Sequence, residues 1–174
     1  LRIGSKAMLE AIRPAALLAR PERRPDTAPV AELVSGARVF ITGGGTGLGS
    51  AIALEFARLG ANVVIASRNP EHLEVGRARI EEVGGSVLAV GCDIRDPEQI
   101  AAAFDEATAA FGLPGVLINN AAANFPVPAE DMSPNAGRTV VDITLNGTFF
   151  CCREFGRRHL EAGTPGSIVN IGAT

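Results

Sequence analysis

Hydrophobic and polar residues follow two alternating patterns along the chain from Ala37 onward. Short runs rich in apolar and β-branched residues predict strands at 38–42, 62–66, 86–90, 115–118 and 167–171. Between them, apolar residues recur at helical spacing, which predicts helices near 47–59, 70–83, 97–111 and 134–162. Runs such as VVIAS and VLIN are apolar throughout, as is typical of strands covered on both faces. The sequence therefore predicts an α/β fold with a Rossmann-type doubly wound parallel sheet.

The predicted sheet has about five strands, whereas a complete dinucleotide-binding sheet of this type has about six. The sequence stops soon after the fifth predicted strand, at Thr174. We therefore expect the fold of this chain to be incomplete at its C-terminal side.

One apolar stripe marks the expected buried face of the first predicted helix. It consists of Leu48, Ile52, Phe56 and Leu59, which are spaced three or four residues apart.

The first 36 residues differ from the rest of the chain. They carry four prolines, and the run RPERRPDTAP is typical of an extended linker. The acidic residues Glu10, Glu22 and Asp26 count against a targeting peptide, which is usually poor in acids. We predict that residues 1–36 form a loosely ordered extension and that 37–174 form the nucleotide-binding domain.

Composition narrows the possible partners and the cellular compartment. With 16 basic and 19 acidic residues, the net charge of -3 disfavours a nucleic-acid binder. The chain has no apolar run of roughly 20 residues, so we expect no membrane helix. The three cysteines, Cys92, Cys151 and Cys152, suit neither a disulfide framework nor a metal site, because their number is odd and two are adjacent. We expect no bound metal, and a reducing, cytoplasmic environment.

A glycine-rich run joins the first predicted strand to the first predicted helix. The sequence V-F-I-T-G-G-G-T-G-L-G provides a tight turn and lets the backbone approach a pyrophosphate closely. The free N–H groups of the following helix would face that anion. The run predicts a dinucleotide site that includes Gly43, Thr46, Gly47, Leu48 and Gly49.

The spacing of these glycines resembles that of the short-chain dehydrogenase/reductase family. The pattern is T-G-x-x-x-G-x-G, and a second motif, N-N-A-A at Asn119–Ala122, stands where the family has N-N-A-G. The resemblance covers residues 37–174. Within the family it is greatest to the 2,4-dienoyl-CoA reductases, through the segments ASRN, CDIRD, INNAAANF, SPNA and DITLNGT.

The residues after the second predicted strand indicate which cofactor is used. Enzymes that use NAD place an acidic residue here to bind the ribose hydroxyls. This chain has Ser67 and Arg68 instead, and a guanidinium suits a 2′-phosphate. We predict NADPH as the cofactor; the alternative is that Arg68 is a surface arginine with no ligand.

The resemblance implies roles for further residues around the cofactor. Asp93 and Ile94 are expected at the adenine ring, although Asp93 could instead cap the next helix. The resemblance places Asn120, Ala121 and Ala122 beside the ribose and the nicotinamide. It also implies that Asn146, within L-N-G-T, helps to organise the catalytic centre.

The same resemblance places four residues near an acyl-CoA substrate, and each has an alternative interpretation. Arg95 could instead be a solvated side chain paired with Asp96, and Phe125 could pack in the core. Ser133 could cap a helix that begins with the following proline. Asn124 continues the loop towards the substrate and is a candidate hydrogen-bond donor to the thioester oxygen.

Two further groups bear on activity and assembly. The chain has no tyrosine and its one lysine is Lys6, whereas the resemblance places a catalytic tyrosine and lysine beyond Thr174. We therefore expect the complete protein to reduce 2,4-dienoyl-CoA thioesters and this chain to bind NADPH without turnover. The alternatives are a 3-oxoacyl or other carbonyl reductase, or a noncatalytic NADP(H)-binding fragment. The resemblance also implies a homodimer or homotetramer. His72 and His159 lie on predicted helices without a partnering motif, so we expect them to be surface or interface residues.

Overall fold

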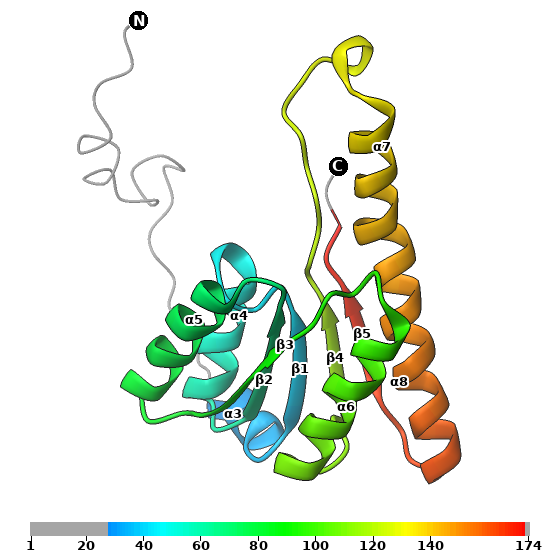
Figure 1. Ribbon diagram of the computed structural model, residues 1–174. Helices are drawn as coiled ribbons and strands as arrows, with labels where there is room; N and C mark the ends of the chain where they lie inside the picture. The colour runs from blue at the N-terminus through cyan, green and yellow to red at the C-terminus, as the bar shows by residue number, and fades with distance from the viewer. Residues whose placement is uncertain (1–27, 173–174) are drawn as a thin grey trace, which may run out of the picture.

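The computed structural model describes residues 28–172 and contains one five-stranded parallel sheet with the order β3-β2-β1-β4-β5 (Figure 1). The strands are β1 (Arg38–Thr42), β2 (Asn62–Ser67), β3 (Ser86–Gly91), β4 (Val116–Asn119) and β5 (Ser167–Asn170). Each of the five lies within one residue of its predicted bounds. The order confirms the Rossmann-type sheet.

Helices cover both faces of this sheet (Figure 1). Helices α4 (Gly47–Arg58) and α5 (Pro70–Glu82) pack on one face, and α6 (Pro97–Phe111) and α8 (Thr148–Ala162) on the other. Local sequence explains two of the helix starts. Asn69 caps α5 and Asp96 caps α6, and each is followed by a proline at the first helical position.

Two apolar cores result, one on each side of the sheet. On the side of α6 and α8, the rings of Phe40 and Phe104 stack with centroids 4.5 Å apart, and Phe155 meets Phe104 edge-on. On the side of α4 and α5, the side chains of Val39 and Ile41 are fully buried. The strands are apolar on both faces because each face belongs to a core.

The predicted buried stripe of α4 is found only in part, because Ile52 and Phe56 pack against the core whereas Leu48 does not. Leu48 is 58% exposed, and the buried residues of this helix are small, namely Gly49, Ser50, Ala53 and Ala57. Small side chains let the axis of α4 lie close to the strands. The larger residues of the helix then lie beside this contact and not in its centre. Ile52 and Phe56 are half-buried there and line an apolar groove with Val30 and Val34.

The boundary predicted for the N-terminal extension also needs correction. Residues 1–27 lie outside the described part of the chain, but Ala28–Val34 form a helix, α3. The turn after it is tied to the domain, because the N–H of Gly36 donates to the carbonyl of Gly60 at 2.9 Å. The ordered fold therefore begins before Ala37.

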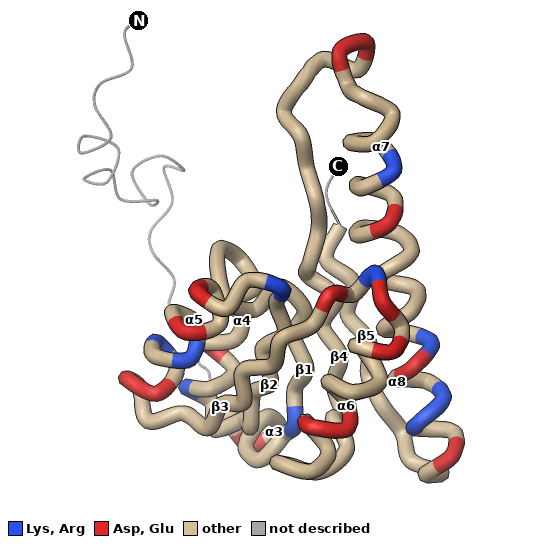
Figure 2. Tube along the Cα trace, viewed as in Figure 1, with Lys and Arg blue, Asp and Glu red and all other residues tan. Residues whose placement is uncertain are grey.

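The connection from β4 to α8 forms an arm beyond the C-terminal ends of the strands (Figure 1). A loop over residues 120–128 rises to a short 3-10 helix, η1 (Ala129–Asp131), and the chain returns through α7 (Pro134–Val141). The predicted helix over 134–162 exists as a continuous rod, but its middle, η2 (Asp142–Gly147), is a π-helical turn. The loop from Asn120 to Pro128 carries no charged side chain, as the tan tube of Figure 2 shows.

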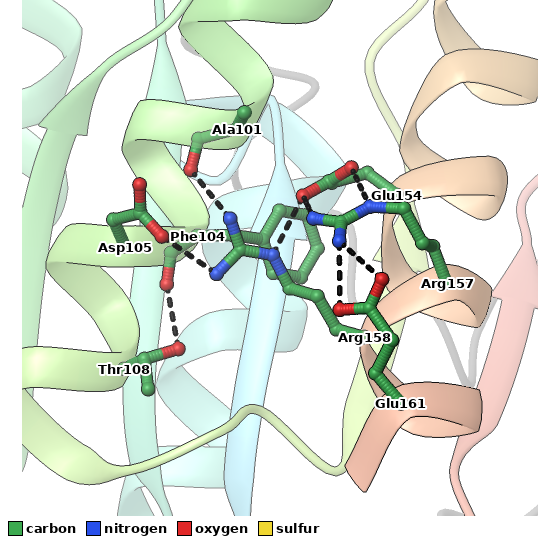
Figure 3. A network of polar contacts seen from close by, with 8 residues as sticks. All are labelled: Ala101, Phe104, Asp105, Thr108, Glu154, Arg157, Arg158 and Glu161. Carbon is green, nitrogen blue, oxygen red and sulfur yellow. Dashed lines mark hydrogen bonds and ion pairs between the residues drawn. The ribbon is translucent and has the colours of Figure 1, made fainter.

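A polar network joins α6 to α8 (Figure 3). The Arg158 guanidinium lies 5.6 Å from the centroid of the Phe104 ring and donates to the carbonyl of Ala101 at 3.0 Å. It also pairs with Asp105 at 2.8 Å and with Glu154 at 2.7 Å. The arginines around Glu154 hold the pKa of this buried carboxyl below its usual range, chiefly through the hydrogen bond from Arg157.

His159 is buried, which corrects its prediction as a surface or interface residue. It is 8% exposed, and its Nε2 lies 2.9 Å from the carbonyl oxygen of Pro114. Its Nδ1 lies 3.0 Å from the hydroxyl of Thr164. His159 thus joins the end of α8 to the segment that leads into β4.

Over residues 28–172, no helix has the length and apolar character required to cross a membrane.

Candidate functional site

A cavity of about 370 Å³ opens where the C-terminal ends of β1, β2, β3 and β4 meet. Ligands of open parallel sheets bind at this edge, where the strand order reverses. Its lining comes from the segments that follow four strands and from the π-helical turn. The lining residues are Gly43, Gly45, Thr46, Ala66, Ser67, Arg68, His72, Cys92, Asp93, Ile94, Asn120, Ala121, Ala122 and Ile143.

The glycine-rich turn is shaped by two requirements that only glycine meets. Gly43 has a φ of 65°, a left-handed conformation that side chains disfavour. Gly49 is in the first turn of α4, where a Cβ would lie 2.3 Å from the Gly43 carbonyl oxygen. The absence of side chains lets the start of α4 fold back tightly on the end of β1.

The start of α4 also leaves hydrogen-bond donors available. Thr46 is the N-cap residue, but its side chain makes no capping hydrogen bond, whereas Asn69, Asp96 and Ser133 cap the starts of α5, α6 and α7. The first backbone N–H groups of a helix have no partners within the helix and carry partial positive charge. This end of α4 therefore suits an anion such as a phosphate.

Thr42 connects the two motifs of the site. Its buried hydroxyl accepts hydrogen bonds from the backbone N–H groups of Asn120 at 3.1 Å and Ala121 at 3.0 Å. In return, the Asn120 side-chain amide donates to the carbonyls of Thr42 at 3.1 Å and Gly43 at 3.2 Å. The sequence analysis missed Thr42, although its place between an apolar strand and the glycines was a signal.

Three charged side chains lie together at the rim of the cavity. Asp93 follows β3, and its carboxylate accepts two hydrogen bonds from the Arg95 Nε at 3.0 Å each. Arg68, which follows β2, lies further off, with its Nη1 3.9 Å from the Asp93 Oδ2. The hydrogen bond from the Arg95 side chain is the main cause that holds the pKa of Asp93 below its usual range.

These contacts decide two alternatives that the sequence left open. Arg95 pairs with Asp93 and not with Asp96. The cap of α6 is Asp96, which accepts from the backbone N–H of Glu98 at 2.9 Å, so Asp93 is not the capping residue.

The π-helical turn reaches the cavity through Ile143, while Asn146 lies on the same turn outside the lining. The Asn146 amide donates to the Asp142 carboxylate at 3.0 Å. Gly147 packs against Ile94, because a Cβ at Gly147 would lie 2.7 Å from that side chain. A π-helical turn often marks a functional position, and here it contributes Ile143 to the cavity lining.

The predicted substrate residues on the arm lie away from the cavity lining. Asn124 and Phe125 are exposed in the uncharged loop, so Phe125 does not pack in the core. Ser133 caps α7 by accepting from the backbone N–H of Ala136 at 3.1 Å, as the alternative interpretation predicted.

The cavity gathers most of the predicted cofactor residues but not all of them. Gly47, Leu48 and Gly49 lie in the first turn of α4 outside the lining. Sequence reasoning missed Gly45, Ala66, His72, Cys92 and Ile143. His72 is exposed, as predicted for a surface residue, and it also lines the cavity.

The cysteines near the site are unsuited to nucleophilic chemistry. Burial raises the pKa of Cys92 to about 12 and also raises that of Cys151. A thiol with a raised pKa stays protonated near neutral pH and is a weak nucleophile. Cys151 is buried in the core between α8 and the sheet, where it acts as a small apolar side chain.

The residues present fit a nucleotide that carries phosphates. The glycine turn makes room for a ligand backbone, the uncapped start of α4 offers donors to an anion, and Arg68 offers a guanidinium at the same rim. A family model described as short chain dehydrogenase matches residues 37–174. The chain belongs to the short-chain dehydrogenase family. Members of this family bind nicotinamide cofactors.

Similar proteins agree with this assignment. The chain is 41% identical over 136 residues to a Bacillus subtilis protein named probable 2,4-dienoyl-CoA reductase, with 78% of this chain and 54% of that protein covered. It is 45% identical over 140 residues to a Caenorhabditis elegans protein also named probable 2,4-dienoyl-CoA reductase, with 79% and 45% covered. The chain spans about half the length of the curated relatives it matches.

A solved structure shares the fold. The crystal structure of a short chain dehydrogenase from Bacillus anthracis superposes with a TM-score of 0.77 at 41% identity, covering 80% of this chain and 56% of that one. The described sheet therefore has the architecture of a known dehydrogenase domain.

Proposed function

We propose that the complete protein is an NADPH-dependent reductase of 2,4-dienoyl-CoA thioesters that acts in the breakdown of unsaturated fatty acids. The observation that carries the proposal is the cavity at the strand ends, which joins the glycine turn to Arg68 in a chain more than 40% identical to proteins named as such reductases. Alternative functions are a 3-oxoacyl or other carbonyl reductase and a noncatalytic NADP(H)-binding fragment.

Each segment at or beside the cavity is assigned to one part of the cofactor. The uncapped start of α4, with Gly47, Leu48 and Gly49, would bind the pyrophosphate. Arg68 and Ser67 would bind the 2′-phosphate. The segment after β3, Asp93 and Ile94, would meet the adenine, and the residues after β4, Asn120, Ala121 and Ala122, would meet the ribose and nicotinamide.

Charge supports NADPH over NADH. Ser67 and Arg68 stand where an acidic residue would bind the hydroxyls of NADH and repel a 2′-phosphate. The Arg68 side chain is 53% exposed, and within residues 28–172 its ion pair is the long one to Asp93 at 3.9 Å. Its donors are therefore available to a phosphate, which a guanidinium binds with charge-assisted hydrogen bonds.

The arm supplies the candidate substrate contacts. Phe125 is 37% exposed in a loop without charged residues, and an apolar thioester chain would cover it. The amides of Asn124 and Asn146 are the candidate donors to the thioester oxygen, where negative charge develops during reduction. Ser133 stays a predicted contact of the substrate in addition to its role as helix cap.

The reaction is a reduction of a conjugated diene. Bound NADPH supplies the hydride, and a protein acid or water supplies the proton that completes the enoyl-CoA product. The chain has no tyrosine, so a tyrosine acid is absent from these 174 residues. We therefore expect this chain to bind NADPH and to show no turnover.

The proposal is tested by measuring NADPH oxidation by the complete protein, with a length similar to that of the relatives. A 2,4-dienoyl-CoA and a 3-oxoacyl-CoA of the same chain length are compared. Oxidation with the dienoyl thioester supports the proposal, and oxidation only with the oxoacyl thioester supports a carbonyl reductase. Binding of NADPH without oxidation by either thioester supports a noncatalytic protein.

We also propose a homo-oligomer and a cytoplasmic location. Apolar side chains on η2 and α8 support an interface, since Leu145 and Phe149 are 65% and 59% exposed. Light scattering of the complete protein would test the oligomer. The three cysteines of the chain are free, which supports a reducing compartment.

A further inference from the structure

Arg95 makes more hydrogen bonds to the carboxylate of Asp93 than an ordinary surface ion pair does. Its Nε lies 3.0 Å from both carboxylate oxygens and its Nη2 lies 2.5 Å from Oδ2. Its backbone N–H donates to Oδ1 at 3.0 Å. The four contacts fix the guanidinium against one carboxylate, which itself is only 19% exposed.

The backbone around this pair is fixed as well. The N–H of Asp93 donates to the Gln99 side chain at 2.9 Å, and the Gln99 amide donates to the Asp96 carboxylate at 2.9 Å. Asp96 in turn caps α6. The position of Asp93 relative to the cavity therefore depends on the start of a core helix and not on a free loop.

Arg68 shares the same carboxylate from the other side. Its Nη1 lies 3.9 Å from the Asp93 Oδ2, and both residues line the cavity. A carboxylate with no other partner would draw the Arg68 guanidinium to itself and repel a phosphate beside it. With Arg95 in place, the three side chains together carry one positive charge; without it they carry none.

We propose that Arg95 is a positioning residue that sets the preference for a 2′-phosphate, because it neutralises Asp93 and so leaves Arg68 free to bind that phosphate. The inference rests on the proposed function, in which Arg68 meets the 2′-phosphate of NADPH. It gives Arg95 a role at the nucleotide that is separate from the predicted contact with acyl-CoA.

The test uses the 174-residue chain and two nucleotides that differ only in the phosphate of interest. Binding of adenosine 2′,5′-bisphosphate and of 5′-AMP is measured by calorimetry for the wild type and for Arg95→Gln. The substitution is expected to weaken bisphosphate binding by about tenfold, the scale of one ionic contact, and to leave 5′-AMP binding nearly unchanged. Arg77→Gln is the matched control, because it removes an exposed arginine from an ion pair with Glu74 on α5, outside the cavity lining.

A second variant separates charge neutralisation from structural damage. In Arg95→Gln/Asp93→Asn the carboxylate that Arg95 neutralises is gone, so the preference for the bisphosphate is expected to return towards that of the wild type. A merely structural role of Arg95 predicts further loss in the double variant, and that result would overturn the inference. Circular dichroism of each variant checks that it is folded.

The outcomes also distinguish this inference from the proposed function. If the wild type prefers the bisphosphate and Arg95→Gln keeps that preference, the role of Arg95 is wrong while NADPH binding stands. If Arg95→Gln weakens both nucleotides equally, the role of Arg95 is also wrong. If the wild type shows no preference, the NADPH proposal fails and the role of Arg95 fails with it.

Discussion

The hydroxyl of Thr42 accepts the backbone N–H of Asn120 at 3.1 Å across the ends of β1 and β4. This contact joins the glycine turn to the N-N-A-A motif, which are separate in the sequence. Both motifs face one cavity because the two strands are neighbours in the sheet. The contact therefore sets the relative position of two segments that we propose to hold the pyrophosphate and the nicotinamide ribose of one cofactor.

Replacement of Thr42 tests that connection. Thr42→Val keeps the volume but leaves the N–H groups of Asn120 and Ala121 without their acceptor, so we expect a loss of about 1–3 kcal/mol in the free energy of unfolding. NADPH affinity is expected to fall as well. Thr42→Ser keeps the hydroxyl and should retain most of the affinity, as measured by urea denaturation and by NADPH titration. Equal behaviour of the two variants would contradict the role of the hydroxyl.

Close packing of the glycine turn makes a second prediction. Gly49→Ala places a Cβ near the Gly43 carbonyl oxygen and the Asn120 amide, so we expect a destabilisation of about 1–3 kcal/mol. The matched control is Gly156→Ala on α8, where a Cβ would meet open space. That control should stabilise the protein by about 0.5–1 kcal/mol, the usual gain of alanine over glycine inside a helix. Thermal unfolding followed by circular dichroism compares the two, and an equal effect of both substitutions would argue against the packing explanation.

The polar network in Figure 3 makes the free energy of unfolding depend on pH. The pKa of Glu154 is lower in the folded protein than its ordinary value of 4.5, so the folded state binds protons less readily there. Its contribution to stability is complete above about 4.5 and is lost as the pH falls through the folded-state pKa. We expect Glu154→Gln to lose stability at neutral pH but to depend less on pH below about 4. Parallel pH profiles of the variant and the wild type would refute this account.

Arg158 is expected to matter more than an exposed arginine. Arg158→Met leaves the buried Glu154 with Arg157 alone and removes the contacts to Ala101 and Asp105, so we expect a loss of about 2 kcal/mol. Arg58→Met breaks an exposed pair with Glu55 and should cost less than about 0.5 kcal/mol. Urea denaturation measures both, and similar losses in the two variants would show that the network adds little.

Much of the fold follows from the sequence because its signals are local. The five strands are short apolar runs, and Asn69-Pro70 and Asp96-Pro97 mark two helix starts. The exposure of Leu48 on α4 was missed because depth of burial depends on how closely the helix approaches the sheet. There the small residues Ala53 and Ala57, and not the larger Leu48, fill the space.

The candidate site was predictable to the extent that it consists of backbone turns at strand ends. The ion pairs that decide the electrostatics of the site depend on side-chain geometry, which the spacing of residues in the sequence does not give. Asp96 was the partner considered for Arg95 from the sequence, whereas the structure pairs Arg95 with Asp93. The π-helical turn also packs closely on Ile94 through Gly147, and these two residues are far apart in the chain.

Arg68 provides the most direct test of cofactor choice by substitution. Arg68→Gln removes the charge proposed to bind the 2′-phosphate, so NADPH affinity is expected to fall by about tenfold while NADH affinity changes little. Arg77→Gln is again the control. An equal loss for both cofactors would mean that Arg68 supports the fold of the rim and does not read the phosphate.

The central claim, that this cavity binds NADPH in preference to NADH, is tested most directly by titrating the unmodified chain with each reduced cofactor. The chain has no tryptophan or tyrosine, so cofactor fluorescence can be followed with little protein background. The account predicts saturable binding of both, with the lower Kd for NADPH. Equal or tighter binding of NADH, or no binding of either cofactor, would contradict it.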